Sequence, residues 1–158
     1  MCGIFGLVKS KNSNISDFDT LESINKLFIF SQTRGSEAAG VAINTGKSID
    51  VYKKAGSPKE FVKSLEYRKL FKNSIQTYNK SNNSSTLSII GHSRLVTNGY
   101  QSENQNNQPV VIPACVGIHN GIITNHAQLW HENKHLKKET ELDTEIFLKI
   151  LKDKIDNG

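Results

Sequence analysis

The 158-residue sequence has little of what would place it in a specialised structural class. It contains only two cysteines, Cys2 and Cys115, which are too few for a disulfide framework and favour a reducing compartment such as the cytoplasm. No apolar run approaches the roughly 18 residues that a membrane-spanning helix needs. No basic and apolar leader precedes Cys2, so no secretory signal is predicted. We therefore expect a cytoplasmic protein without a membrane span.

The positive charge of the chain is also limited in kind. The net charge of +5 comes almost wholly from scattered lysines, whereas arginine occurs only at positions 34, 68 and 94. No basic block is interleaved with aromatic residues, so the sequence predicts no nucleic-acid partner. Because the planar fork of arginine matches a carboxylate better than lysine does, such a chain can keep arginine for specific contacts. The length and a hydrophobic content of 36% fit one domain with an ordinary core.

Apolar spacing predicts strands and helices in alternation along the chain. The expected strands are residues 3–9, 39–43, 49–53, 87–91 and 115–119, and the expected helices are residues 17–32, 57–70 and 144–155. Two stretches rich in polar residues, 72–85 and 98–108, are predicted to be loops, and the first of them to be mobile. This pattern fits an α/β fold and an α+β fold equally well.

The most distinctive chemistry lies in the first six residues, MCGIFG. If Met1 is removed, Cys2 carries a thiol and a free α-amine on the same residue. An α-amine titrates near neutral pH and can accept the proton of a thiol, so one residue then supplies a nucleophile and its base. The alternative is a small buried residue that opens a strand. These six residues alone leave both interpretations open.

Four further polar blocks lie at the ends of predicted elements. They are RGSEAAG at residues 34–40, GHSRLVTNG at 91–99, HNGIITN at 119–125 and LDTE at 142–145. Each block alone has an ordinary structural explanation, because Asn-Gly favours hairpin turns and Asp-Thr caps helices. Together with Cys2 they meet the needs of a thiolate that attacks the amide of a free amino acid.

Those needs are an oxyanion hole and groups that bind the two charged ends of the substrate. The side-chain N–H of Asn120 and the backbone N–H of Gly121 can donate to an oxyanion. Arg94 offers a fork for a carboxylate, and Asp143 offers an anion for an ammonium group.

The order CGIFG, RGxxxAG, GHxRxxTxG, HNGxIxN and DTE resembles the glutaminase domain of class II glutamine amidotransferases. These enzymes are N-terminal-nucleophile hydrolases, and the resemblance spans residues 2–151. It implies an α+β fold, the αββα sandwich, and hydrolysis of glutamine to glutamate and ammonia. RGSEAAG is similar to the RGQEAAG of amidophosphoribosyltransferases, whereas glucosamine-phosphate synthases tend to show RGYDSAG. Asparagine synthetases rank third, because they usually lack Thr-x-Gly after the arginine.

The resemblance implies a role for residues in each matched block. Cys2, Asn120 and Gly121 would be catalytic; Arg94, Thr97, Asn98 and Asp143 would bind glutamine; Arg34 and Gly99 would support the loops around Cys2. No cofactor is implied. Two substitutions depart from the family pattern, since Asn98 stands where many relatives have His or Thr, and Leu142 where Ser or Thr is common.

The length of the chain departs from the family as well. Family domains continue past the DTE helix with more strands, so residues 1–158 are expected to form a glutaminase domain that is shortened at its C-terminus. It would be either a fragment of a longer enzyme or a natural short form, and an oligomer is possible. No synthase domain is present, so the expected partner is a synthase domain or subunit that receives the ammonia.

The residues also allow two alternative functions, and three histidines raise the question of a metal site. The first alternative is a silent module of the same fold that binds glutamine or a partner, favoured if Met1 stays on Cys2. The second is a hydrolase of another amide, which Arg94 and Asp143 argue against because they match both ends of a free amino acid. The histidines at 126, 131 and 135 have helical spacing, but no Cys, Asp or Glu nearby completes a usual ligand set, so no metal is expected.

Overall fold

The computed structural model describes residues 2–10, 12–81, 86–95 and 103–157. Its elements, in chain order, are β1 (Gly3–Lys9), α1 (Asp17–Ser31), β2 (Ala38–Asn44), β3 (Ile49–Ala55), α2 (Pro58–Phe61), α3 (Leu65–Lys80), β4 (Leu87–Arg94), the 3-10 helix η1 (Asn104–Asn106), β5 (Val110–Ile112), β6 (Cys115–Gly117), α4 (His126–Glu132) and α5 (Thr144–Asn157). Among the described residues, no helix combines the length and the apolar character that crossing a membrane requires.

A four-stranded antiparallel sheet lies at the centre of the described structure. Its strand order is β1-β4-β2-β3, so β4 pairs with both β1 and β2. In this register Gly3 pairs with Ser93, and Ala38 pairs with Arg94. The start of β1, the end of β4 and the start of β2 therefore share one end of the sheet. Three of the sequence blocks meet there.

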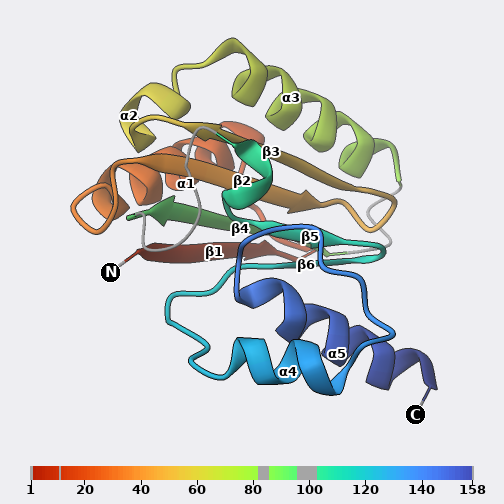
Figure 1. Cartoon of the computed structure of the whole chain (residues 1–158). Coiled ribbons are helices and arrows are strands. Elements are labelled where there is room, and N and C mark those ends of the chain that lie inside the picture. Colours follow the sequence, from red (N-terminus) through yellow and green to blue (C-terminus); the bar gives the residue numbers. More distant parts are fainter. Residues whose placement is uncertain (1, 11, 82–85, 96–102, 158) are drawn as a thin grey trace.

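The helices α1, α2 and α3 cover one face of this sheet (Figure 1). Side chains from these helices and from alternate strand positions form one large core, which includes Ile24, Phe28, Val41, Phe61, Tyr67, Phe71, Ile75, Tyr78 and Ile89. The ring of Phe28 contacts those of Phe5 and Phe61, with centroids 4.7 and 4.9 Å apart. Burial of this many aromatic groups gives the sheet a stable support on this side.

The hairpin of β5 and β6 lies on the other face, and α4 and α5 lie beyond it (Figure 1). A smaller core of Val110, Ile112, Leu142 and Leu148 joins the hairpin to α5. Gly117 permits this approach, since a Cβ there would lie 2.7 Å from a methyl group of Leu148. The layers are thus α, β, β, α, and the predicted α+β fold, the N-terminal-nucleophile hydrolase sandwich, is confirmed.

Two predictions about the middle of the chain are wrong. The helix expected over residues 57–70 is broken, because Ser64 caps a new helix by accepting a hydrogen bond from the backbone N–H of Tyr67. The loop expected from residue 72 is helical as far as Lys80, because Phe71, Ile75 and Tyr78 recur at helical spacing and are buried. Residues 82–85 of that expected loop lie outside the described residues.

The C-terminal elements also differ from expectation. The last predicted strand ends at Gly117 rather than residue 119, and β5 and α4 were not predicted. In α5 the buried residues include Ile146 and Leu148, whereas Phe147 and Leu151 are exposed. Of the expected loop 98–108, the described part contains η1.

Candidate active site

Cys2 lies at the sheet end where the sequence blocks converge. Its thiol donates to the carbonyl oxygen of Leu95, with sulfur and oxygen 3.5 Å apart. Its backbone nitrogen donates to Oδ1 of Asn120 at 3.1 Å. In this chain that nitrogen belongs to the Met1–Cys2 peptide bond, and removal of Met1 would turn it into an α-amine. The structure thus brings together Cys2 and Asn120, two residues that the resemblance makes catalytic.

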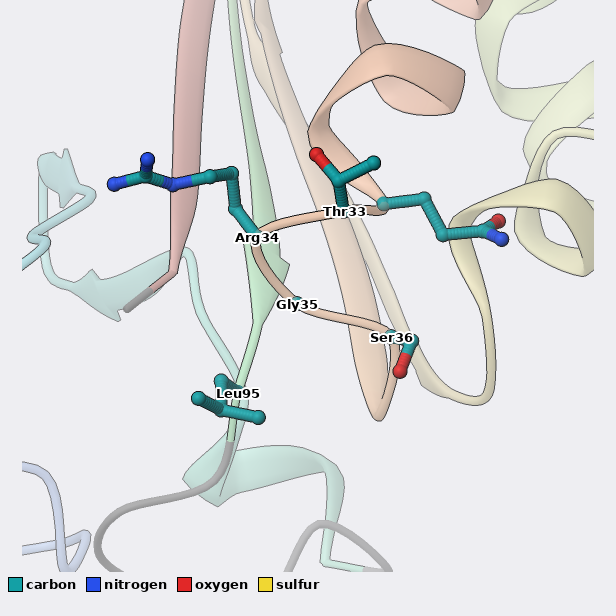
Figure 2. Close-up of a pocket in the computed structure, with 6 residues that line it drawn as sticks. Thr33, Arg34, Gly35, Ser36 and Leu95 are labelled. Atoms are coloured by element: carbon teal, nitrogen blue, oxygen red, sulfur yellow. The ribbon is translucent and has the colours of Figure 1, made fainter.

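The loop of residues 32–36 runs beside this end of the sheet and, with Leu95, lines a pocket of about 350 Å³ (Figure 2). Arg34 is exposed on this loop, and its side chain extends away from the loop backbone. Gly35 lets the loop lie against β4, because a Cβ there would be 2.4 Å from the carbonyl carbon of Arg94. Gly35 therefore packs against the Arg94–Leu95 peptide bond, next to Leu95, whose carbonyl oxygen accepts from Cys2.

Arg94, the last residue of β4, is buried with 4% of its surface exposed. Its Nη1 donates to Oδ1 of Asn107 at 2.7 Å. Burial lowers the pKa of Arg94, and the charges of Cys2 and Glu37 oppose this effect. The guanidinium is therefore close enough to Cys2 for their charges to interact, and it is tied to the segment that follows η1.

Asp143 lies immediately before α5. Its Oδ2 accepts from the backbone N–H of Ile123 at 2.6 Å, and its Oδ1 accepts from the hydroxyl of Thr144 at 3.3 Å. Asp143 therefore holds the chain segment that carries Asn120 and Gly121. Whether it also binds a substrate ammonium group stays a prediction.

Gly121 follows Asn120 in that exposed segment. A Cβ at this position would lie 2.6 Å from Nε2 of His119, so the absence of a side chain lets the His119 ring fold over the turn. The remaining predicted site residues, Thr97, Asn98 and Gly99, lie outside the described residues.

Two polar residues next to the site, the buried Gln108 and the half-buried Lys53, were not predicted to belong to it. The amide of Gln108 binds both backbone groups of His119: Nε2 donates to the carbonyl oxygen at 3.0 Å, and Oε1 accepts from the N–H at 2.6 Å. Lys53 donates to the carbonyl oxygens of Asn107 and Pro109 at 2.7 and 3.1 Å. Burial lowers the pKa of Lys53 to about 8, and the charge of Arg94 adds to this effect. In the sequence, the segment that contains Gln108 is marked only by Asn107 and Gln108 before Pro109.

His92 occupies the interior of β4, two residues before Arg94, and is fully buried. Burial lowers its pKa to about 4; the backbone of His119 opposes that shift, and the charges of Arg94 and His119 add to it. The ring is close enough to His119 for this effect, but neither of its nitrogens has a hydrogen-bond partner among the described residues. His92 is therefore neutral near pH 7, which suits the positive charge of Arg94 nearby.

Within the described ranges, no group of three or more His, Cys, Asp or Glu side chains could hold a metal ion. Cys2 and Cys115 are both free thiols.

The sequence of this chain is similar to part of the sequences of several larger enzymes. No family model matches it. It is 32% identical over 155 residues to glutamine–fructose-6-phosphate aminotransferase (isomerizing) of Francisella tularensis, a match that covers 96% of this chain and 22% of that protein. It is 30% identical over 163 residues to the Bradyrhizobium diazoefficiens protein of the same name, a match that covers 100% of this chain and 23% of the relative.

A second kind of enzyme also matches. The amidophosphoribosyltransferase of Methanocaldococcus jannaschii is 29% identical over 151 residues, which cover 93% of this chain and 26% of that protein. The chain thus spans about a quarter of the length of the curated relatives it matches. Similarity along nearly the whole chain to both kinds of enzyme agrees with the αββα layers and with the order of the sequence blocks. The chain therefore belongs to the class II glutamine amidotransferase family, in the part that forms the N-terminal-nucleophile domain.

Proposed function

We propose that this chain hydrolyses the side-chain amide of glutamine to glutamate and ammonia in the cytoplasm, with Cys2 as the nucleophile. The observation that carries the proposal is the 3.1 Å hydrogen bond from the Cys2 nitrogen to Asn120 Oδ1, which joins residues 118 positions apart. The buried cation Arg94 is the last residue of β4, at the same end of the central sheet as Cys2. A nucleophile, an amide and a cation thus converge as a glutaminase requires.

The first step follows from the position of the Cys2 nitrogen. Once Met1 is removed, the α-amine takes the thiol proton, and the sulfur attacks the side-chain carbonyl carbon of glutamine. Because Oδ1 of Asn120 accepts from the Cys2 nitrogen, its Nδ2 is the end that donates to the developing oxyanion. The backbone N–H of Gly121 would be the second donor.

The second step returns the enzyme to its starting state. The α-ammonium of Cys2 gives its proton to the leaving nitrogen, the C–N bond breaks, and ammonia departs from a γ-glutamyl thioester. The α-amine then takes a proton from water, and the hydroxide attacks the thioester carbon. The C–S bond breaks, the thiolate takes the proton back, and glutamate leaves.

The substrate would be held at its two charged ends. Arg94 would bind the α-carboxylate, with Thr97 and Asn98 helping, and Asp143 would bind the α-ammonium. Both oxygens of Asp143 accept one hydrogen bond in the structure, and a carboxylate has about four acceptor positions, so acceptor positions remain for the ammonium. Arg34 and Gly99 would support the surrounding loops.

The fate of the ammonia is proposed from the relatives. The names of two relatives denote transfer of an amino group from glutamine to fructose 6-phosphate, and the chain matches less than a quarter of each. We infer that residues 1–158 act as one glutaminase domain that supplies ammonia to a synthase domain or subunit.

The test is an intact mass spectrum before and after exposure to a diazo-ketone analogue of glutamine. We expect loss of Met1 and one adduct that maps to Cys2 and is suppressed by glutamine. Cys115→Ser should react like the wild type and Cys2→Ser should not react. A chain that lacks Met1 and binds glutamine, but forms no adduct, would instead be a silent module. Arg94→Ala should weaken glutamine binding steeply, and an unchanged Michaelis constant would contradict its assigned role.

A further inference from the structure

The segment of residues 107–109 connects the two halves of the site, although it belongs to none of the five matched sequence blocks. Asn107 and Gln108 are buried, with 0% and 8% of their surfaces exposed. The Asn107 amide accepts from Arg94, and the Gln108 amide binds the backbone of His119. Adjacent side chains therefore contact the proposed carboxylate-binding cation and the residue that precedes the proposed oxyanion hole.

The backbone of this segment is held by two strands of the central sheet. Gly40 of β2 lets it lie flat on the sheet, because a Cβ there would be 2.1 Å from the carbonyl oxygen of Gln108. Lys53 of β3 donates to the carbonyl oxygens on both sides of Gln108, those of Asn107 and Pro109. These contacts hold the backbone of residues 107–109 in place, and with it the positions of both side-chain amides.

The chemistry of Gln108 suits a positioning role. A carboxamide has an acceptor oxygen and a donor nitrogen at one end, so it can satisfy the N–H and the C=O of one residue together. These two bonds hold His119, and Asp143 holds Ile123 by its backbone N–H. Asn120 and Gly121, the proposed oxyanion donors, lie between the two held positions.

We propose that Asn107 and Gln108 are positioning residues that act on separate parts of the reaction. Asn107 orients the Arg94 guanidinium for the substrate carboxylate, and Gln108 orients the backbone that presents the oxyanion donors. Neither touches the reacting atoms. The inference rests on the proposed glutaminase function and adds two residues to it.

Because the two roles are separate, substitutions at the two neighbouring positions should change different kinetic constants. Misplacement of catalytic donors by about 1 Å costs on the order of 100-fold in rate. Gln108→Met, which keeps the side-chain volume, should lower the maximal rate of Cys2 modification by about 10- to 100-fold, with little change in the half-saturating concentration. Asn107→Leu should raise the half-saturating concentration about tenfold, with a smaller change in the maximal rate.

The experiment measures adduct formation at Cys2 over a range of concentrations of the diazo-ketone analogue, using the full chain. Gln108→Glu keeps the acceptor for the His119 N–H but loses the donor, so its maximal rate should fall between those of the wild type and Gln108→Met. Gln128→Met is the matched control, because Gln128 is exposed on α4 and its amide binds only Glu132 among the described residues.

A second reagent and a stability measurement separate positioning from folding. Iodoacetamide alkylates a thiolate without needing an oxyanion hole or a carboxylate site, so under alkaline conditions that ionise thiols its rate at Cys2 should match the wild type in both variants. Thermal unfolding of both should remain cooperative. Equal changes in both kinetic constants for the two substitutions, or altered iodoacetamide rates, would show a merely structural segment and overturn the inference. If the wild type itself forms no adduct, the proposed function fails and the inference fails with it.

Discussion

The two faces of the central sheet are stabilised in different ways. The face toward α1, α2 and α3 is covered by a large apolar core in which aromatic rings contact one another. The opposite face carries a small apolar cluster of Val110, Ile112, Leu142 and Leu148, joined by Cys115. Much of the described chain on that side is held by side chains that bind backbone groups.

Glu145 shows what these polar contacts achieve. Its buried carboxylate accepts from the backbone N–H groups of Glu139 and Thr140 and from the Thr140 hydroxyl, and it pairs with Lys149 at 2.9 Å. Hydrophobic burial is non-directional, whereas hydrogen bonds depend steeply on distance and angle. We therefore expect the apolar face to supply most of the stability and the polar face to fix the geometry of the loops that carry Asn120 and Asp143.

The largest expected effect comes from comparing one core residue on each face. Phe28→Ala should lower the free energy of unfolding by about 4 kcal/mol, because its ring is fully buried among three other aromatic rings. Leu148→Ala should cost about 2 kcal/mol, because its smaller side chain packs in the smaller cluster. Urea denaturation of both variants measures the two values. Equal losses would mean that the two cores contribute alike, and the comparison would fail.

The next largest effect is the loss of stability in acid that we expect from His92. The pKa of His92 is lowered from 6.5 to about 4 in the fold, so between these values the unfolded chain binds more protons than the folded chain. Stability therefore falls as the pH decreases from about 6.5 toward 4. We expect a loss of about 2.2 kcal/mol between pH 6.5 and 4.5.

Unfolding by urea at several pH values checks this slope, and His92→Leu provides the control because leucine cannot titrate. The variant should show a nearly flat profile between pH 6.5 and 4.5. If the variant keeps the wild-type slope, the acid sensitivity arises elsewhere, and the buried histidine is not its cause.

Sequence reasoning succeeded where the signal was local. The apolar pattern located the strand of residues 3–9 at the bounds that β1 has. The helix expected from residue 57 begins there, because Ser57 caps α2 in a capping box with Glu60, and Pro58 is its first residue. The helix through residue 80 was missed because polar residues outnumber its few buried ones. The strand β5 has only three residues, and α4 has seven and no side-chain cap, so neither gave a strong pattern.

The site could be predicted in part because its blocks carry unusual residue types. Cys2 and Asn120 are in contact, and Asp143 binds the segment that carries Asn120. The roles of these residues stay predictions. Gln108 and Lys53 could not be found, because their meaning depends on contacts with distant backbone atoms. A glutamine in a polar loop has no local signature of such a contact.

The smallest expected effect tests the polar face directly, through Glu145→Gln. Burial raises the pKa of Glu145, but hydrogen bonds from Lys149, Thr140 and Glu139 outweigh it and lower that pKa below 4.5. A glutamine offers one acceptor oxygen and turns its NH2 toward a donor, so a backbone N–H loses its partner. The expected loss is about 2 kcal/mol at pH 7.

The pH dependence of that loss distinguishes the carboxylate from simple packing. The stabilisation by Glu145 is present above pH 4.5 and is lost as the pH falls through the lowered pKa, so the stabilities of wild type and variant should converge once the pH lies below that pKa. Glu132→Gln, at an exposed position on α4, should change stability by about 0.5 kcal/mol or less. Hydrogen exchange of the Glu139 and Thr140 amides should accelerate in Glu145→Gln by more than that of amides in β4, which exchange only when the whole fold opens. Equal acceleration in β4 would show that the polar face supports global stability as much as loop geometry, and the division between the two faces would not hold.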